Sequence, residues 1–590
     1  MKLELIDWAI IIIYLLISLS IGLYFRKQAG KSLTDYFLSG RKLPWYVAGI
    51  SMVATTFAAD TPLAVTELVG QNGISGNWLW WNMLMGGMLT TFFFAKLWRR
   101  ADILTEAEFI ELRYSGKEAS FLRGFKAAYL GLFMNVLIIA WVNVALATLI
   151  EVFFGIPRGE TWMYVGAAML ITALYSSLSG LWGVAVTDMV QFVLAMTGSI
   201  VLAVLVIQSD KIGGISGLTR QLPDSALNFF PQIGMSENIG TTLTITVASF
   251  FAYMSIWFMS WYPGAEPGGG GYVAQRMMSA RSEKDSVWAT LFFQIAHYAI
   301  RPWPWIIVAL ACIVLYPDLS DTDKKLGYVM AMQEFLPIGL KGLMIAAFLA
   351  AYMSTISTQL NWGASYIVND LYKRFLHQPK ENVDSEKTYV TAGRIVTLII
   401  MAVALVVTLF IETISGVWSF IIECGAGLGM VLILRWLWWR INAWSEISAT
   451  IAPFIAYGFS KFVLGLEFPN SFFITVGFTT VVWLLVTFIT SPSDHKTLEH
   501  FYNKIKPLGS WGPFSNRDQN TGNTKELLLL IVAWLSATVM TYSILFFIGD
   551  YILQHNSNLI TWGASGITSF VILYFSIQNS NLFQEKTETN

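Results

Sequence analysis

The chain has 590 residues, of which 55% are hydrophobic and only 13% are charged, whereas about a quarter of an ordinary soluble domain is charged. This composition excludes a soluble globular protein and indicates a polytopic membrane protein. The 37 basic residues balance 38 acidic ones, so no net field attracts nucleic acid as a partner. The two cysteines both lie inside apolar runs, which excludes a disulfide framework and a cysteine-rich metal site.

Apolar runs of about 20 residues predict about fifteen transmembrane segments in an all-α protein. In chain order the runs cover 5–25, 44–70, 77–98, 125–154, 161–180, 184–207, 240–262, 287–316, 336–368, 391–411, 416–437, 443–464, 470–490, 525–549 and 559–577. The first run has no Ala-x-Ala cleavage site, and Arg26 and Lys27 follow it directly. We therefore expect a retained helix there rather than a signal peptide.

Basic residues concentrate in alternate connections between these runs. With the N-terminus outside and the C-terminus inside, most of the 37 basic residues fall in inner loops, in agreement with the positive-inside rule. We expect a multi-pass protein of the plasma membrane, or of the inner membrane if the source is bacterial. Its partner is then the lipid bilayer, and nothing in the sequence indicates an obligate protein partner.

Two of the runs are interrupted by residues that a regular helix does not tolerate. The run at 44–70 carries Asp60, Thr61 and Pro62 at membrane depth, where proline frees a backbone carbonyl. The seventh run is followed by WYPGAEPGGGGYVAQRMMSAR at 261–281, with two prolines and five glycines around Glu266. Interruptions five spans apart are typical of an inverted repeat with its binding site at the bilayer midplane.

This pattern predicts five parts along the chain. They are an N-terminal helix with an inner loop at 1–43, a first inverted repeat at 44–207, an outer loop at 208–239, a second inverted repeat at 240–437, and accessory C-terminal helices with a short tail at 438–590.

Four hydroxyl side chains lie close together in the run 336–368, within the segment AAYMSTIST at 350–358. At 100° per residue, one helix face carries Ala351, Ser354, Thr355 and Thr358, and Ser357 lies beside it. Small polar residues also allow membrane helices to pack closely, and that alternative is weakened by the interrupted helices. A cluster of uncharged oxygens inside a membrane suits a small hard cation such as Na⁺.

Four stretches together resemble one transporter family, and they occur in its order and spacing. They read DYFLSGRKLPWYVAGISMVAT at 35–55, YSSLSGLWGVAVTDMVQF at 175–192, YVAQRMMSARSEKDS at 272–286 and GLMIAAFLAAYMSTIST at 342–358. In them the chain resembles the sodium:solute symporter family, which includes sodium/glucose, sodium/proline and sodium/sialic acid carriers. The resemblance covers about 35–440. It implies a LeuT-type fold of inverted five-helix repeats with extra N- and C-terminal helices, and import of a solute by alternating access.

The resemblance also implies where Na⁺, the expected coupling ion, binds. The family's common sodium site corresponds to main-chain oxygens of Ala54, Phe57 and Ala351 and to hydroxyls of Ser354 and Thr355. Members with a second sodium use an aspartate and further hydroxyls, which correspond to Asp188, Ser354, Ser357 and Thr358. Two interpretations of Asp188 stay open, a second Na⁺ ligand or a carboxylate that is solvated or paired with a base.

The expected cargo is a small polar organic solute. The family's geometry implies that the positions facing its cavity are Thr56, Asp60, Thr61, Trp257, Trp261 and Glu266. Sugar carriers place a carboxylate in the third span, where this chain has Trp80, Trp81 and Asn82. That difference argues against sugar binding in their manner, although Trp80 could still stack on a ring.

Three charged residues leave the class of solute open. Asp60 and Glu266 favour an amine, and Arg301 favours a carboxylate. Alternatively, Asp60 caps a half-helix, Glu266 lies in an exposed loop and Arg301 extends to the membrane surface. Proton coupling through Asp60 or Asp188 and a transporter-like sensor are the competing functions. An enzyme is not expected, because the five histidines are scattered and no HExxH or GxSxG motif occurs.

Overall fold

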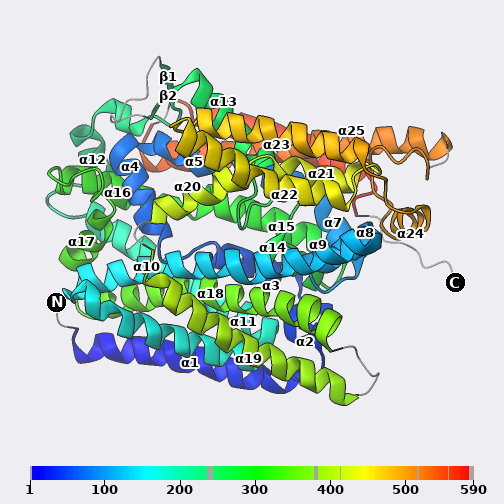
Figure 1. Ribbon diagram of the computed structural model, residues 1–590. Coiled ribbons are helices and arrows are strands. Elements are labelled where there is room, and N and C mark those ends of the chain that lie inside the picture. Colours follow the sequence, from blue (N-terminus) through cyan, green and yellow to red (C-terminus); the bar gives the residue numbers. More distant parts are fainter. Residues whose placement is uncertain are drawn as a thin grey trace.

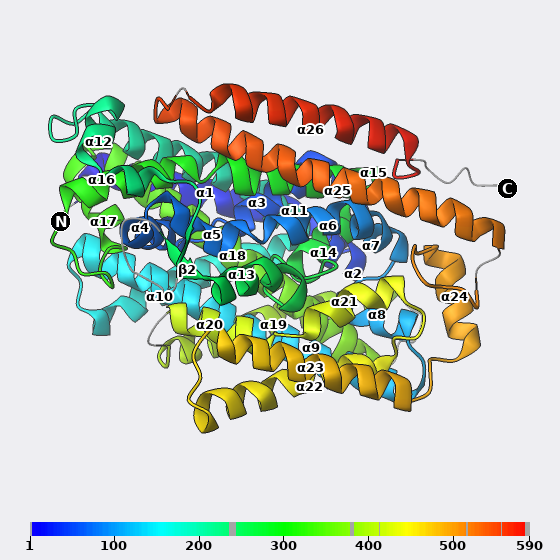
Figure 2. The same cartoon turned by 90° about the horizontal axis from the view of Figure 1, so that it is seen from above.

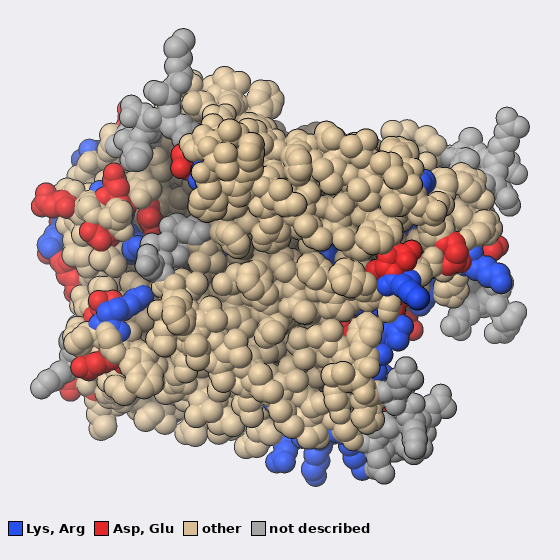
Figure 3. All heavy atoms as spheres, viewed as in Figure 1, with Lys and Arg blue, Asp and Glu red and all other residues tan. Residues whose placement is uncertain are grey.

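The computed structural model describes residues 3–234, 243–377, 383–411, 414–514, 517–555 and 557–583. Within these ranges the long helices run roughly side by side (Figure 1). Charged side chains gather at both ends of the face in Figure 3, and a wide, almost uncharged band separates them. Large hydrophobic side chains are also exposed on α1 (Leu5–Ala29), α23 (Asn470–Ile489) and α26 (Leu559–Asn579), and such an apolar surface suits a lipid bilayer.

Along the chain, long helices alternate with short helices and connecting turns. The first half contains α1 (Leu5–Ala29), α2 (Leu33–Leu38), η1 (Ser39–Arg41), α3 (Trp45–Thr55), α4 (Thr61–Asn72), η2 (Ile74–Asn77), α5 (Trp78–Trp81), α6 (Leu84–Leu89), η3 (Thr90–Phe94), α7 (Ala95–Ala101), α8 (Glu106–Arg113), α9 (Gly116–Ala128), η4 (Tyr129–Met134), α10 (Asn135–Phe154), η5 (Arg158–Glu160), α11 (Thr161–Ile207), α12 (Ile215–Gln221), η6 (Asp224–Leu227), β1 (Gln232–Gly234), β2 (Thr244–Thr246) and α13 (Val247–Met259). The second half contains α14 (Gly271–Ser279), α15 (Glu283–Ile295), η7 (Ala296–Ile300), α16 (Trp303–Leu315), α17 (Leu326–Phe335), α18 (Leu340–Tyr366), η8 (Ile367–Leu376), α19 (Val383–Thr408), α20 (Ile414–Cys424), α21 (Leu428–Leu437), α22 (Ala443–Gly458), η9 (Phe459–Val463), α23 (Asn470–Ile489), α24 (His495–Ile505), α25 (Arg517–Ile552) and α26 (Leu559–Asn579). The strands β1 and β2 pair in parallel, with Ile233 opposite Ile245.

The core of the bundle is built around α18. This helix packs along α11 and also contacts α1, α3, α10 and α19. The C-terminal helices lie at the outer edges, with α25 and α26 on one side and α22 and α23 on the other (Figure 2). Helix α18 is buried over most of its length, so its hydroxyl groups face protein rather than lipid.

A sharp kink at Gly180 divides α11 into two parts. Gly180 has φ 57° and ψ −161°, a conformation that glycine adopts readily. A Cβ atom there would lie 2.6 Å from the carbonyl oxygen of Tyr36. The two expected runs at 161–180 and 184–207 are therefore the two parts of one helical stretch, on either side of this kink, and the second part carries Asp188.

Both expected interruptions are present. Helix α3 ends at Thr55 and α4 begins at Thr61, while α13 ends at Met259 and α14 begins at Gly271. Four glycines with positive φ, namely Gly264, Gly268, Gly269 and Gly271, allow the chain to turn repeatedly within the second interruption.

A third interruption lies between α20 and α21, where a continuous run at 416–437 was expected. Gly427 has φ 92°, and its N–H donates to the Met259 carbonyl at 2.7 Å. The Trp261 N–H donates to the Gly425 carbonyl at 3.2 Å, and the Ser260 hydroxyl donates to the Ile422 carbonyl at 2.5 Å. Main-chain hydrogen bonds thus join this third interruption to the one after α13.

We expect Gly425→Ala to destabilise the protein by about 1–3 kcal/mol, because added atoms in a packed site force the backbone apart. A Cβ at 425 would lie 2.7 Å from the Trp261 carbonyl oxygen. Thermal unfolding in detergent measures the effect. Gly477→Ala on α23 is the matched control, since no atom lies within 4 Å of its Cβ position. Equal melting temperatures for the two variants would contradict this packing.

Nine helical stretches in the described part of the chain are long and apolar enough to cross a membrane, against about fifteen expected. The difference has a structural cause. One stretch contains both halves of α11, and the interrupted helices leave apolar pieces such as Trp45–Thr55, Val247–Met259 and Leu428–Leu437 that are shorter than a span. The expectation of many apolar transmembrane helices is confirmed, and the count of fifteen is not.

Candidate functional site: the contact between the α3 break and α18

The end of α3 packs directly against the hydroxyl face of α18. The Thr355 hydroxyl donates to the main-chain carbonyl of Thr55 at 2.8 Å. One turn further along α18, the Thr358 hydroxyl lies 3.0 Å from the Thr55 hydroxyl. The structure therefore brings together the two walls that the sequence suggests for a cation site.

Four of the five positions suggested for the first sodium site lie at this contact. The Phe57 N–H donates to the Ala54 carbonyl at 3.0 Å, and the Ala351 carbonyl accepts from the Thr355 hydroxyl at 3.3 Å. Phe57 and Ala351 line one small cavity between the helices. All these side chains are buried, and the oxygens are uncharged, which fits a monovalent cation. The hydroxyl of Ser354, the fifth position, is directed elsewhere.

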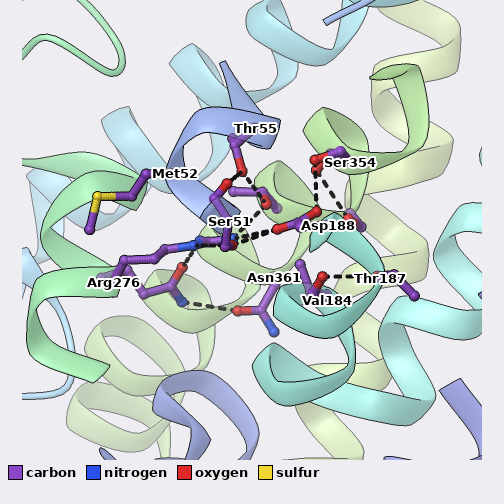
Figure 4. Close-up of polar contacts among 12 residues, drawn as sticks. Ser51, Met52, Thr55, Val184, Thr187, Asp188, Arg276, Ser354 and Asn361 are labelled. Atoms are coloured by element: carbon purple, nitrogen blue, oxygen red, sulfur yellow. Dashed lines mark hydrogen bonds and ion pairs between the residues drawn. The ribbon is translucent and has the colours of Figure 1, made fainter. Parts of the chain in front are cut away.

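The residues suggested for a second sodium surround Asp188 on α11, which is fully buried. Its carboxylate accepts hydrogen bonds from Ser51 at 2.5 Å and from Ser354 at 2.7 Å. Figure 4 shows these groups converging from α3, α11 and α18. Ser357 does not join them, because its hydroxyl donates to the Ser354 carbonyl in its own helix at 3.1 Å.

The guanidinium group of Arg276 lies among these same oxygens. Its Nη2 is 3.8 Å from the Asp188 carboxylate and donates to the Thr358 hydroxyl at 2.6 Å. Its Nε donates to the Ser51 hydroxyl at 3.2 Å (Figure 4). Arg276 is fully buried and neutralises Asp188 from within the protein. The sequence shows Arg276 within the stretch YVAQR, but it does not reveal that Arg276 pairs with Asp188.

A second polar cluster lies just beyond the end of α3. The Thr56 hydroxyl is 2.9 Å from Nδ1 of His297. The same hydroxyl accepts a hydrogen bond from Nη1 of Arg301 at 3.0 Å. Arg301 also donates to the Val53 carbonyl at 3.1 Å and lies over the Trp305 ring. It is 1% exposed, so it does not extend to the membrane surface. Sequence analysis missed His297, whose position inside an apolar run was its only signal.

Of the other residues suggested to bind the solute, some lie at this cluster and others lie farther away. The Trp80 ring packs edge-on against His297, and Asp60 and Thr61 stand at the start of α4. The Asp60 side chain makes no capping hydrogen bond with α4.

The remaining three suggested positions lie on the interrupted helix α13–α14. Trp257 packs instead against Trp534 of α25. Trp261 is buried at the third interruption, and Glu266 is buried inside the glycine-rich loop rather than exposed. The structure therefore does not gather all the suggested solute contacts around one cavity.

Interrupted apolar helices that hold buried, uncharged oxygens at their contact define an ion-coupled membrane transporter. A family model described as "Sodium:solute symporter family" matches residues 36–452, more than half of the chain. The chain belongs to the sodium:solute symporter family.

Curated relatives match over most of their own length. The chain is 24% identical over 519 residues to a sodium/glucose cotransporter of Vibrio parahaemolyticus, covering 83% of this chain and 92% of the relative. It is 26% identical to a sodium/sialic acid symporter of Proteus mirabilis, with 82% and 95% covered. It is also 26% identical to a sodium/proline symporter of Escherichia coli, with 72% and 82% covered.

A solved structure shares the fold. The structure of a substrate-bound, outward-open Na⁺-coupled sialic acid symporter superposes with a TM-score of 0.67 at 19% identity, covering 84% of this chain and 100% of that one. This similarity confirms the helical transporter fold. As a member of this family the protein is a multi-pass membrane transporter, and it carries out Na⁺-coupled symport of a small solute.

Proposed function

We propose that the protein imports one small polar solute together with one Na⁺, by alternating access. The observation that carries this stoichiometry is the position of Arg276, which fills the second set of oxygens with a permanent positive charge. Na⁺ is then held at the contact between α3 and α18 by Ala54, Phe57, Ala351 and Thr355. Ser354 completes this set when its hydroxyl turns away from Asp188.

One Na⁺ provides enough energy for strong accumulation. A single charge that crosses 100 mV contributes about 2.3 kcal/mol. A tenfold concentration gradient adds about 1.4 kcal/mol. Together they support a several-hundred-fold accumulation of a neutral solute.

We propose that the solute carries a carboxylate that binds near Arg301. Among the described residues, no carboxylate lies within ion-pairing distance of the buried Arg301 guanidinium, and its Nε has no hydrogen-bond partner. Asp60 attracts it only over a longer distance. A buried positive charge without a direct counter-ion favours an anionic ligand group. Proline and sialic acid, the solutes named for two relatives, both carry a carboxylate.

The proposed arrangement of membrane spans is based on the similarity to the same relatives. Each of the half-helix pairs α3–α4, α13–α14 and α20–α21 supplies one span, α11 supplies two, and α5–α7 and α22 supply one each. With the other eight long helical stretches this gives fifteen crossings. The first inverted repeat then begins with α3 and the second with α13. Basic side chains near the end of the bundle at which α26 ends support an outside N-terminus and an inside C-terminus in the plasma membrane, or in a bacterial inner membrane.

A thermal-shift screen of the purified protein identifies the solute. Candidate solutes are tested with and without Na⁺, because a ligand that binds only the folded state raises its stability. We expect stabilisation by a carboxylate solute in NaCl and not in KCl, and none by its amide analogue. Equal stabilisation by the acid and the amide would contradict the role of Arg301.

Thr355→Ala is expected to weaken the apparent Na⁺ affinity by about 10- to 100-fold, because a hydrogen bond or ligand contact to a charge contributes about 1.5–3 kcal/mol. Ser357→Ala is the matched control, since that hydroxyl bonds within its own helix. Na⁺-dependent thermal stability or uptake into proteoliposomes measures both variants. The Hill coefficient for Na⁺ should be near one in the wild type, and equal affinities in the two variants would refute this ligand set.

A further inference from the structure

Glu266 is a buried carboxyl group that the proposed sodium and solute sites do not require. It lies in the glycine-rich interruption between α13 and α14 and is 4% exposed. Neither of its oxygens has a hydrogen-bond partner among the described residues. The N–H groups of Gly264 and of Glu266 itself approach the carboxyl group, but not in hydrogen-bonding geometry. An ionised carboxylate in such a place is costly.

Glycines enclose this carboxyl group closely. A Cβ atom at Gly270 would lie 3.1 Å from the Glu266 Cβ, and one at Gly271 would collide with Glu266 Oε1. Trp362 of α18 approaches the same point, with its Cζ2 3.6 Å from the Cβ position of Gly271. Its indole N–H approaches the Tyr366 phenol but has no partner in hydrogen-bonding geometry among the described residues.

The charged neighbours disfavour an ionised Glu266. Glu106 of α8 accepts the Gly271 N–H at 2.9 Å, and its carboxylate repels a second negative charge nearby. Arg435 of α21 is already paired with Glu106 and with Glu446. The remaining titratable groups that face this place are the phenols of Tyr272 on α14 and Tyr366 on α18.

We propose that Glu266 is a proton-binding site and that this proton is exchanged during the transport cycle. In the conformation described here the carboxyl group carries the proton as an O–H. When the glycine-rich interruption rearranges, that O–H bond breaks, the proton passes to water, and the carboxylate accepts the free N–H of Trp362. Because Trp362 lies two turns beyond Thr355 on α18, release of the proton is linked to the helix that holds Na⁺.

Infrared spectroscopy of the purified protein tests proton binding without any solute. We expect the wild type at neutral pH to show a protonated carboxyl band that shifts in D₂O, and Glu266→Gln to lack that band. Glu266→Asp keeps an acid and should show the band at a shifted position, which provides a second test if Glu266→Gln does not fold. Glu334→Gln is the matched control. The Lys211 ammonium, 2.5 Å away, holds the pKa of Glu334 below its usual value, so this residue is ionised at neutral pH.

Exchange of the proton is tested by adding NaCl or KCl to the same samples. NaCl, and not KCl, should change the amplitude of the band in the wild type and leave Glu266→Gln unchanged. Identical spectra of wild type and Glu266→Gln would overturn proton binding, and a band insensitive to NaCl would overturn its exchange. The proposal rests on Na⁺ coupling only in this second step. Failure of Na⁺ to stabilise the protein at all would instead count against the proposed function.

Discussion

Replacing Arg276 with glutamine is expected to make the stability of the protein depend strongly on Na⁺. The substitution leaves the Asp188 carboxylate buried without its internal counter-ion, which costs about 3–5 kcal/mol in Na⁺-free buffer. The vacated position is surrounded by the oxygens of Asp188, Ser51 and Thr358. Na⁺ can enter there, and binding at a hundred times its Kd returns about 2.7 kcal/mol. The Hill coefficient for Na⁺ should therefore rise from about one toward two.

The measurement is thermal unfolding in matched NaCl and KCl, together with Na⁺ titration of the two proteins. Arg281→Gln is the control, because Arg281 is 62% exposed and pairs with Asp285 near the end of the bundle. Its stability should hardly change and should show no added Na⁺ dependence. If Arg276→Gln is equally stable in both salts, the Arg276 guanidinium does not occupy a position that Na⁺ could bind.

Replacing Arg435 with glutamine is expected to lower the free energy of unfolding by about 3–5 kcal/mol, the usual cost of leaving buried partners unpaired. Arg435 is 1% exposed and contacts Glu106 at 3.2 Å and Glu446 at 3.4 Å. Lys126 also approaches Glu446, at 3.4 Å. The network connects α8, α9, α21 and α22, so its loss also loosens the accessory helices.

Unfolding by SDS in mixed micelles measures this free energy. Lys211→Gln removes an exposed ion pair and should cost less than about 1 kcal/mol. A double-mutant cycle with Glu106→Gln isolates the central pair, for which we expect a coupling energy of about 0.5–3 kcal/mol. A loss at Arg435 as small as that at Lys211 would contradict a structural role for the network.

The sequence predicted those interruptions that contain a helix-breaking side chain. Pro62 and the prolines around Glu266 remove backbone donors, and this effect is visible in a single chain. The break at Gly425–Gly427 contains no proline and stays apolar, so it resembled a continuous span. It exists because the main chain of α13 supplies alternative hydrogen bonds, a tertiary effect without a local signal.

Helical periodicity in the sequence predicts only those parts of the candidate site that lie on a single helix. The common face of Ala351, Ser354 and Thr355 follows from 3.6 residues per turn. The pairing of Asp188 with Arg276 does not, because it joins helices that are 88 positions apart in the sequence. His297 was missed for the same reason, since its partner Thr56 lies just beyond the end of another helix, α3.

The joint between the breaks at Gly425–Gly427 and Met259–Trp261 has a consequence for mutational scanning. Two of its three hydrogen bonds use only main-chain groups, so truncating the side chains of Met259 or Trp261 removes neither of them. Any loss of stability in Met259→Ala or Trp261→Ala would therefore report lost side-chain packing and not these main-chain hydrogen bonds. Only substitutions that add atoms at the glycines, or that replace a backbone amide by an ester, would measure how strongly these main-chain hydrogen bonds hold the two helices together.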